Sequence, residues 1–264
     1  METKQTKIES LLNQFDSLNT SSKYKVVNTG TVLDILQRKG FQVDQVSMTN
    51  ARQHKGYQKH LVRLSNPDFT LNRTDIKPQI LLYNSYNKST ALQFKIGLYR
   101  FVCANGLEAG NSYFNIKHKH QGSVYSFIDN ALNQLDAQLK QLTQDLNSFD
   151  NIMLNQWQLD KFTNRVLNKT VFKDINKPNR IITDVNYAQR DADQGHDLFT
   201  VLNVLQERII RGGIKYQTVK QDQGAFKIIN NTTRAIKSIG KTQDYNTVIF
   251  DEALSIADDI KKAV

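Results

Sequence analysis

A regular apolar stripe in the middle of the chain constrains the fold more than any other feature of the sequence. Its members recur at three- and four-residue spacing: Ile128, Ala131, Leu132, Leu135, Leu139, Leu142 and Leu146. This spacing places them on one side of a long amphipathic helix, which must pack on its own domain or on a helix of a second chain. We therefore expect a helix over residues 125–146, and a homo-oligomer assembled through it is one of the two outcomes.

Three more segments of the second half repeat the helical period. They are Ile152–Leu167, Asp197–Ile210 and Tyr245–Lys261, with a loop around Lys173–Arg190 between the first two. Gly212-Gly213 follow the middle segment, where a helix would end. The second half is therefore expected to be mainly helical.

The first half combines helical patterns with strand-like stretches. Apolar spacing predicts a helix within residues 5–18, and Thr29 or Thr31 can cap a second helix that Gly40 would stop. Apolar and aromatic runs between polar loops are typical of antiparallel strands. The predicted strands are Tyr24–Val27, Phe41–Met48, Gly56–Leu64, Pro78–Tyr86 and Ser112–Lys119.

The segment Ser89–Ala104 is apolar on more than one face, which we interpret as a buried central helix. Asn105-Gly106 would end it, with Gly106 in a left-handed cap. The fold class is therefore α+β: a three- to four-stranded antiparallel sheet packed on a central helix, with a helical C-terminal half. We expect one domain over 1–264, with a basic strand-rich part, 1–120, and a mainly helical part, 121–264.

The positive charge is concentrated in the first half. The chain has 264 residues and a formal net charge of +10. Residues 1–120 contain 17 Lys and Arg against 8 Asp and Glu, whereas residues 121–264 contain 18 against 17. Within residues 38–100 the count is 11 against 3. Such an excess favours binding to a polyanion, and its alternative is a solvated basic surface that serves solubility.

Basic and aromatic residues are interleaved on the predicted strands. In single-strand binding, Lys and Arg meet phosphates while aromatic rings stack on unpaired bases. The phosphate candidates are Arg52, Lys55, Lys59, Arg63, Arg73, Lys77 and Lys88, and the stacking candidates are Tyr57 and Tyr86. His54 and His60, beside the first hairpin loop, suit the same polyanion.

Searches for catalytic and cofactor motifs find nothing. The chain has no phosphate loop, no dinucleotide fingerprint, no nucleophile elbow and no zinc-protease pair, so we expect no cofactor and no catalytic residue. The single cysteine, Cys103, suits packing and a reducing compartment. A polar start and the absence of a long apolar run predict a cytoplasmic protein of a bacterial host cell, without a membrane partner.

Two clusters suit a metal ion by residue type but not by context. His118 and His120 stand two apart on a predicted strand, but their basic neighbours disfavour a cation and favour a surface or phosphate-facing role. The enzymatic alternative is a metal-dependent nuclease, which would hold its metal ion through Asp184, Asp191, Asp193 and Asp197. Their spacing favours loop and helix-capping roles instead, so no metal site is expected.

Two segments resemble the phage/plasmid-like family known as domain of unknown function 932. In residues 82–110 the resemblance is carried by Asn84-Ser85, Ser89, Leu98-Tyr99-Arg100 and Cys103-Ala104-Asn105-Gly106-Leu107. A second match, Asp197–Gly213, is similar to a later helix of the family. The resemblance assigns no activity. The order of elements and the charge are also similar to the single-strand annealing proteins, which include the Red-beta and Erf recombinases.

The combined expectation is a non-catalytic phage- or plasmid-type protein that binds or anneals single-stranded DNA in recombination or replication. The alternative from another class is a host-takeover or anti-defence protein that binds a host protein or an anionic ligand. A basic groove that is open favours the first, and a closed basic pocket favours the second.

Overall fold

The computed structural model of the chain describes residues 26–50, 56–71, 76–100, 105–108, 115–118, 123–173, 180–188, 190–222 and 225–262. Where the sequence predicted a single domain, the chain divides into two compact units, Met1–Thr143 and Gln144–Val264. The division falls inside the long helix α3 (Val124–Asp150) and not in a linker. No change in composition therefore marks it.

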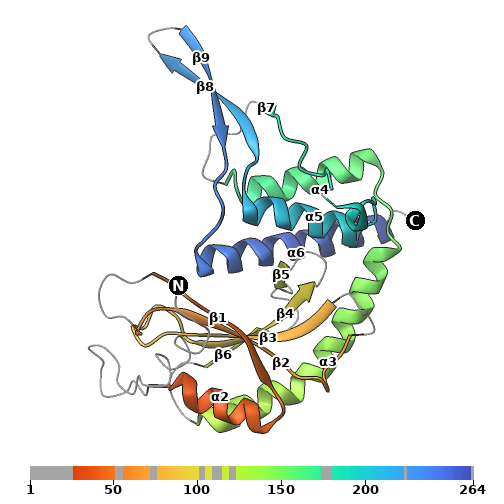
Figure 1. Cartoon of the computed structure of the whole chain (residues 1–264). Coiled ribbons are helices and arrows are strands. Elements are labelled where there is room, and N and C mark those ends of the chain that lie inside the picture. The colour runs from red at the N-terminus through yellow and green to blue at the C-terminus, as the bar shows by residue number, and fades with distance from the viewer. Residues whose placement is uncertain are drawn as a thin grey trace. The chain divides into compact units, whose positions relative to one another are not determined.

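The first unit contains an antiparallel sheet. Its strands are β1 (Gln42–Met48), β2 (His60–Ser65), β3 (Ile76–Asn84), β4 (Leu92–Arg100), β5 (Asn105–Glu108) and β6 (Asn115–His118). They follow the order β1-β2-β3-β4-β5, and β6 pairs with the other end of β4 (Figure 1). The α+β class is confirmed, and the described sheet has six strands where three to four were predicted.

The predicted central helix is wrong, because most of Ser89–Ala104 forms the strand β4. Alternate residues of β4 belong to opposite faces of the sheet, with Leu92, Phe94, Ile96 and Leu98 on one face and Gln93, Lys95, Gly97 and Tyr99 on the other. This is the two-residue period of a strand. Asn105 and Gly106, expected to cap the helix, are the first residues of β5.

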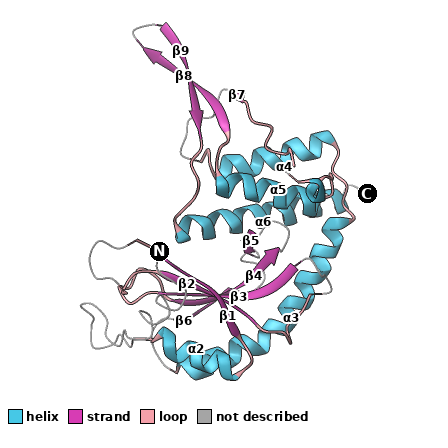
Figure 2. Cartoon of the chain, viewed as in Figure 1, coloured by secondary structure: helices cyan, strands magenta, loops and turns pink. Residues whose placement is uncertain are grey.

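Helices cover the apolar face of the sheet. Val32 and Leu36 of α2 (Thr29–Arg38) are fully buried, and Phe127 of α3 lies 5.3 Å from Phe94 of β4 between ring centroids. The apolar stripe of α3 is buried within this chain, apart from half-buried Leu132. The stripe therefore packs on its own chain and not on a second copy. Figure 2 shows α2 and α3 on the same side of the sheet.

Local signals set the ends of α2. Its N-cap is Asn28, whose side chain accepts a hydrogen bond from the Thr31 backbone N–H, so the predicted threonine caps are displaced by one residue or more. The helix ends before Gly40, as predicted, and Gly40 takes the left-handed conformation (φ 87°) that suits glycine.

The second unit is built on α4 (Gln156–Lys169), α5 (Leu198–Arg211) and α6 (Ile239–Lys262), which confirms the three predicted helices. Gly212 is the C-cap of α5, as expected. Among the helices that the structure describes, none is both long enough and apolar enough to cross a membrane.

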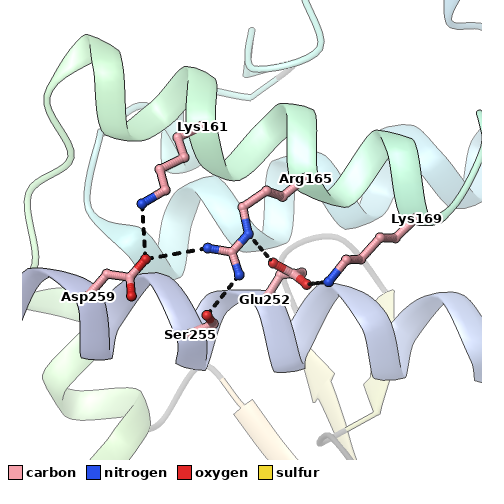
Figure 3. Close-up of polar contacts among 6 residues, drawn as sticks. All are labelled: Lys161, Arg165, Lys169, Glu252, Ser255 and Asp259. Carbon is pink, nitrogen blue, oxygen red and sulfur yellow. Dashed lines mark hydrogen bonds and ion pairs between the residues drawn. The ribbon is translucent and has the colours of Figure 1, made fainter. Parts of the chain in front are cut away.

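An ion-pair ladder joins α4 to α6 (Figure 3). Lys161 Nζ lies 3.0 Å from Asp259 Oδ2, and Arg165 Nε lies 2.6 Å from Glu252 Oε2. Lys169 pairs with the same glutamate. The three cations are four residues apart, which places them along one side of α4. Polar contacts therefore complete the apolar packing of these two helices.

A β-hairpin extends beyond these helices, and the sequence analysis missed it. Its strands are β8 (Lys215–Asp222) and β9 (Ala225–Thr232), and the short strand β7 (Arg180–Ile181) pairs with the base of β8. Figure 1 shows β8 and β9 projecting away from α4 and α5. We call β8 and β9 the hairpin arm.

Truncation at the centre of the first sheet tests the packing. Leu82 of β3 is fully buried on the apolar face, so Leu82→Ala should lower the free energy of unfolding by about 2–5 kcal/mol. Tyr125→Ala, at a residue 59% exposed in the same unit, should change it by less than about 0.5 kcal/mol. Urea denaturation followed by circular dichroism measures both, and equal effects would contradict this account of the core.

Candidate nucleic-acid interface

The face of the first sheet that is opposite to its apolar face carries polar and basic side chains. We call this the polar face. Strand register places two buried leucines, Leu61 and Leu81, on it, together with the following residues: Gln45, Ser47, Arg63, Lys77, Gln79, Tyr83, Gln93, Lys95, Tyr99 and Lys117. Lys59 joins them just before β2, because its Nζ lies 5.3 Å from the centre of the Tyr83 ring. The face therefore gathers basic side chains from β2, β3, β4 and β6.

The structure brings three predicted phosphate contacts, Lys59, Arg63 and Lys77, onto the polar face. Lys88 is exposed in the turn between β3 and β4, where its backbone is left-handed (φ 64°). Tyr57 is half-buried, edge-on to Tyr86 at 6.4 Å between ring centroids. The predicted contacts Arg52, Lys55 and Arg73 lie outside the described residues.

Lys77 has an anionic partner within the chain. Its Nζ lies 2.9 Å from Oδ1 of Asp44, which also accepts hydrogen bonds from Gln79 and Ser65. A register shift between Val43 and Gln45 marks a β-bulge at Asp44, and a bulge redirects the side chain at that point. Burial raises the pKa of Asp44, but the hydrogen bonds and the charge of Lys77 outweigh burial and hold this pKa below its ordinary value.

Arg63 is 8% exposed, so the prediction that it contacts phosphate directly is wrong for this conformation. Its charge is offset by Glu108 of β5, which is fully buried and accepts a hydrogen bond from the hydroxyl of Tyr83. Lys95 Nζ lies 3.6 Å from Glu108 Oε2. Burial raises the pKa of Glu108, although Lys95, Tyr83 and Arg63 oppose this rise. The charges of this cluster therefore offset one another inside the sheet.

Tyr86 is also buried, and its predicted role as a base-stacking platform is wrong. Its hydroxyl oxygen accepts a hydrogen bond from the backbone N–H of Thr29, at the start of α2. Asn84 donates to the Thr29 hydroxyl and to the carbonyl of Val27, so β3 is tied to the entry of α2. The Tyr86 hydroxyl therefore satisfies one of the backbone N–H groups that the start of a helix leaves without partners.

His60 belongs to this same network, and its predicted contact with a polyanion is wrong. Its Nδ1 lies 3.0 Å from the carbonyl of Gln58, which can only accept, so Nδ1 carries the proton. Nε2, 2.8 Å from the Thr29 hydroxyl, is then an acceptor. Burial lowers the pKa of His60 to about 4, so the ring is neutral at pH 7.

The remaining predicted candidates have structural roles or lie outside the described residues. His118 packs on Phe127, 5.0 Å between ring centroids, so the expected surface or phosphate-facing role is wrong for it. Burial lowers its pKa. His54, Cys103 and His120 are not among the described residues.

The carboxylates considered for a metal site are occupied by local contacts. Asp197 caps α5 by accepting from the Thr200 N–H at 2.8 Å, which confirms a capping role. Asp193 lies 3.0 Å from Arg190, which also makes a two-pronged contact with Glu207. Asp184 accepts from a neighbouring backbone N–H. Within the described part of the chain, no group of three or more His, Cys, Asp or Glu residues is arranged to hold a metal ion.

The sequence analysis missed four charged residues of this region: Asp44, Lys95, Glu108 and Lys117. Lys95 was hidden by the predicted helix, although the alternation within β4 carried the signal. Lys117 lies on the polar face of β6 opposite Gln93, which follows from the two-residue period once the register is known. The pairings of Asp44 and Glu108 had no sequence signal, because their partners lie on other strands.

Comparisons with known proteins complete this description. A family model described as a domain of unknown function, DUF932, matches residues 19–246. UPF0380 protein YafZ and UPF0380 protein YfjQ of Escherichia coli (strain K12) are each 24% identical to the chain over 234 residues, 88% of this chain and 82% of each relative. No solved structure matches the chain. The similarity to single-strand annealing proteins stays a prediction.

The neutral state of His60 predicts a pH dependence of stability. The folded pKa of about 4 lies below the ordinary value of 6.5, so the unfolded chain binds the proton more tightly. The stability that neutral His60 contributes is therefore fully present above pH 6.5. It is lost as pH falls to about 4, which lowers the free energy of unfolding by about 3 kcal/mol. Urea titrations at several pH values measure it.

His60→Gln is the control for this pH dependence, because glutamine has no proton to gain in that range. The variant should lose stability less steeply than the parent between pH 6.5 and 4. Parallel curves for the two proteins would contradict a buried neutral histidine.

Proposed function

The chain belongs to the DUF932 family, and we propose that it is a non-catalytic protein that binds single-stranded DNA through the polar face of its first sheet. Annealing of complementary strands in recombination or replication is the activity that we expect from such binding. The proposal draws on the charge of the first half and on the geometry of the polar face, since neither the family name nor those of the relatives assign an activity.

The observation that carries the proposal is the one-sided distribution of cations on the sheet. Lys59 and Lys77 are half-buried and Lys117 is exposed on the polar face, while the apolar face is covered by α2 and α3. Each lysine that meets a phosphate releases a condensed counterion, and this release drives association with a nucleic acid. Arg63 and Lys95 are buried, and their charges offset that of Glu108.

An aromatic side chain beside one of these lysines favours a single strand over a duplex. Tyr99 is half-buried on the polar face, opposite Lys77 in the strand register. An unpaired base can stack on such a ring, whereas a base within a duplex cannot leave its neighbours without cost. Tyr99 therefore replaces Tyr86 as a stacking candidate.

Anisotropy of a labelled single-stranded oligonucleotide tests the function. Affinity should fall by about tenfold or more between 50 and 200 mM salt, as expected for three or more phosphate contacts. The triple variant Lys59→Gln, Lys77→Gln, Lys117→Gln should reduce the slope of log affinity against log salt by about 2. A flat affinity over this range would overturn the proposal.

The control for these lysines removes the same charge from exposed sites elsewhere. Lys140, Lys173 and Lys262 are all exposed, so their replacement by glutamine should leave both the affinity and the salt slope close to the parent values. Equal losses in the two triple variants would show that net charge, and not the polar face, determines binding.

Asp44 offers a test in the opposite direction. Because Asp44 holds Lys77, Asp44→Asn should free that lysine for a phosphate and tighten oligonucleotide binding several-fold at low salt. The exposed Asp68 gives the matched control, since Asp68→Asn removes one negative charge without freeing a lysine. An equal effect of the two variants, or none of Asp44→Asn, would argue against Lys77 as a contact.

A further inference from the structure

The hairpin arm of the second unit has two unlike faces. Cross-strand register pairs Val219 with Ile228 on one face, and pairs Lys220 with Lys227 on the other. All four side chains are exposed. We call the face of Lys220 and Lys227 the basic face of the arm.

Two lysines directly opposite each other are unfavourable in an isolated hairpin, because like charges at paired positions repel. In the part of the chain that the structure describes, no carboxylate forms an ion pair with Lys220 or Lys227. The pair therefore lowers the stability of the arm, and the carboxylate that the register places on the same face, Asp222, comes two residues after Lys220 at the tip. An anion from outside the chain would offset the repulsion.

The base of the arm contains a cavity with the same sign of charge. Its volume is about 340 Å³, and its charged lining residues are Arg234, Lys237 and Lys241, with no carboxylate in the lining. Thr233 and Ser238, which each carry a hydroxyl, also line it. Cations and hydroxyl donors without a carboxylate suit the oxygens of a phosphate group.

The cavity and the basic face are continuous. Tyr216 lines the cavity and also lies on the basic face, because it precedes Lys220 by four residues along β8, an even number. That separation is about 13 Å along a strand. A single phosphate cannot contact cations at both ends, so the spacing favours a chain of phosphates. Residues 215–241 contain six Lys and Arg against one Asp, an excess that the near-neutral second half conceals.

The backbone around Arg234 is fixed before any ligand arrives. Gly212 has a left-handed backbone (φ 75°), and a Cβ there would lie 2.5 Å from the carbonyl carbon of Arg234. Gly213 N–H donates to the Thr233 carbonyl at 2.9 Å, and Thr233 N–H donates to the Ile214 carbonyl at the same distance. The two glycines that end α5 therefore hold the cationic segment against that helix end.

We propose that the basic face of the arm and the cavity at its base form one site for a chain of phosphates, separate from the polar face of the first sheet. The polymer is the backbone of a nucleic acid, an identification that rests on the proposed function. Lys220 and Lys227 contact one part of the chain, and Arg234, Lys237 and Lys241 contact another.

Two probes test the site, inorganic polyphosphate and the labelled single-stranded oligonucleotide. The arm variant carries Lys220→Gln, Lys227→Gln, Arg234→Gln and Lys237→Gln, all at exposed positions. It should bind polyphosphate at least tenfold more weakly at 50 mM salt, with a salt slope lower by about 3. Circular dichroism should match the parent protein, and the control with Lys140, Lys173 and Lys262 replaced should stay within threefold of the parent affinity.

A smaller variant guards against misfolding. The double variant Lys220→Gln, Lys227→Gln removes a repulsion, so it should not destabilise the protein. It should still reduce the slope of log affinity against log salt by about 1.4. Unchanged polyphosphate binding in both arm variants would overturn the proposed site, even if the parent binds the oligonucleotide. Arm-dependent polyphosphate binding by a parent protein that ignores the oligonucleotide would instead uphold the site and overturn the proposed function.

Discussion

The first unit depends on the burial of both faces of its central strands, β3 and β4. Most of their apolar residues face α2 and α3, while their polar residues face the opposite side together with the buried Leu81, so each strand separates two chemically different layers. The apolar layer excludes water from the core, which is the main favourable contribution to folding. The polar layer must then satisfy its own charges, and the pairs Lys77–Asp44 and Lys95–Glu108 do so.

Residue periodicity predicted the elements whose packing is one-sided. The stripe of α3 and the apolar face of α4 have a helical period because one side of each is buried, and the predicted positions of these helices and of α5 and α6 were correct. β4 was misread because Phe101 and Val102 extended its apolar character past the end of the alternation. Within Leu92–Leu98 every second residue is apolar without exception, so the strand was predictable from a narrower window.

The candidate site was less predictable than the fold, because the role of each charged side chain depends on its partners on other strands. Segment charge drew attention to the first sheet, but it could not tell a lysine that faces solvent from an arginine that neutralises Glu108. Tyr86 satisfies a backbone N–H of α2, 57 residues earlier in the chain, and no local pattern predicts such a bond. The hairpin arm was missed because its basic residues were averaged with the acidic helices around them.

Salt acts on the hairpin arm in two opposite ways. At physiological ionic strength charges are screened over about 8 Å, so added ions weaken the repulsion between the paired Lys220 and Lys227. The same ions compete with the lysines for any phosphate. The free arm is therefore least stable under the conditions in which its lysines attract a phosphate most strongly, and a bound phosphate chain would relieve the repulsion in place of salt.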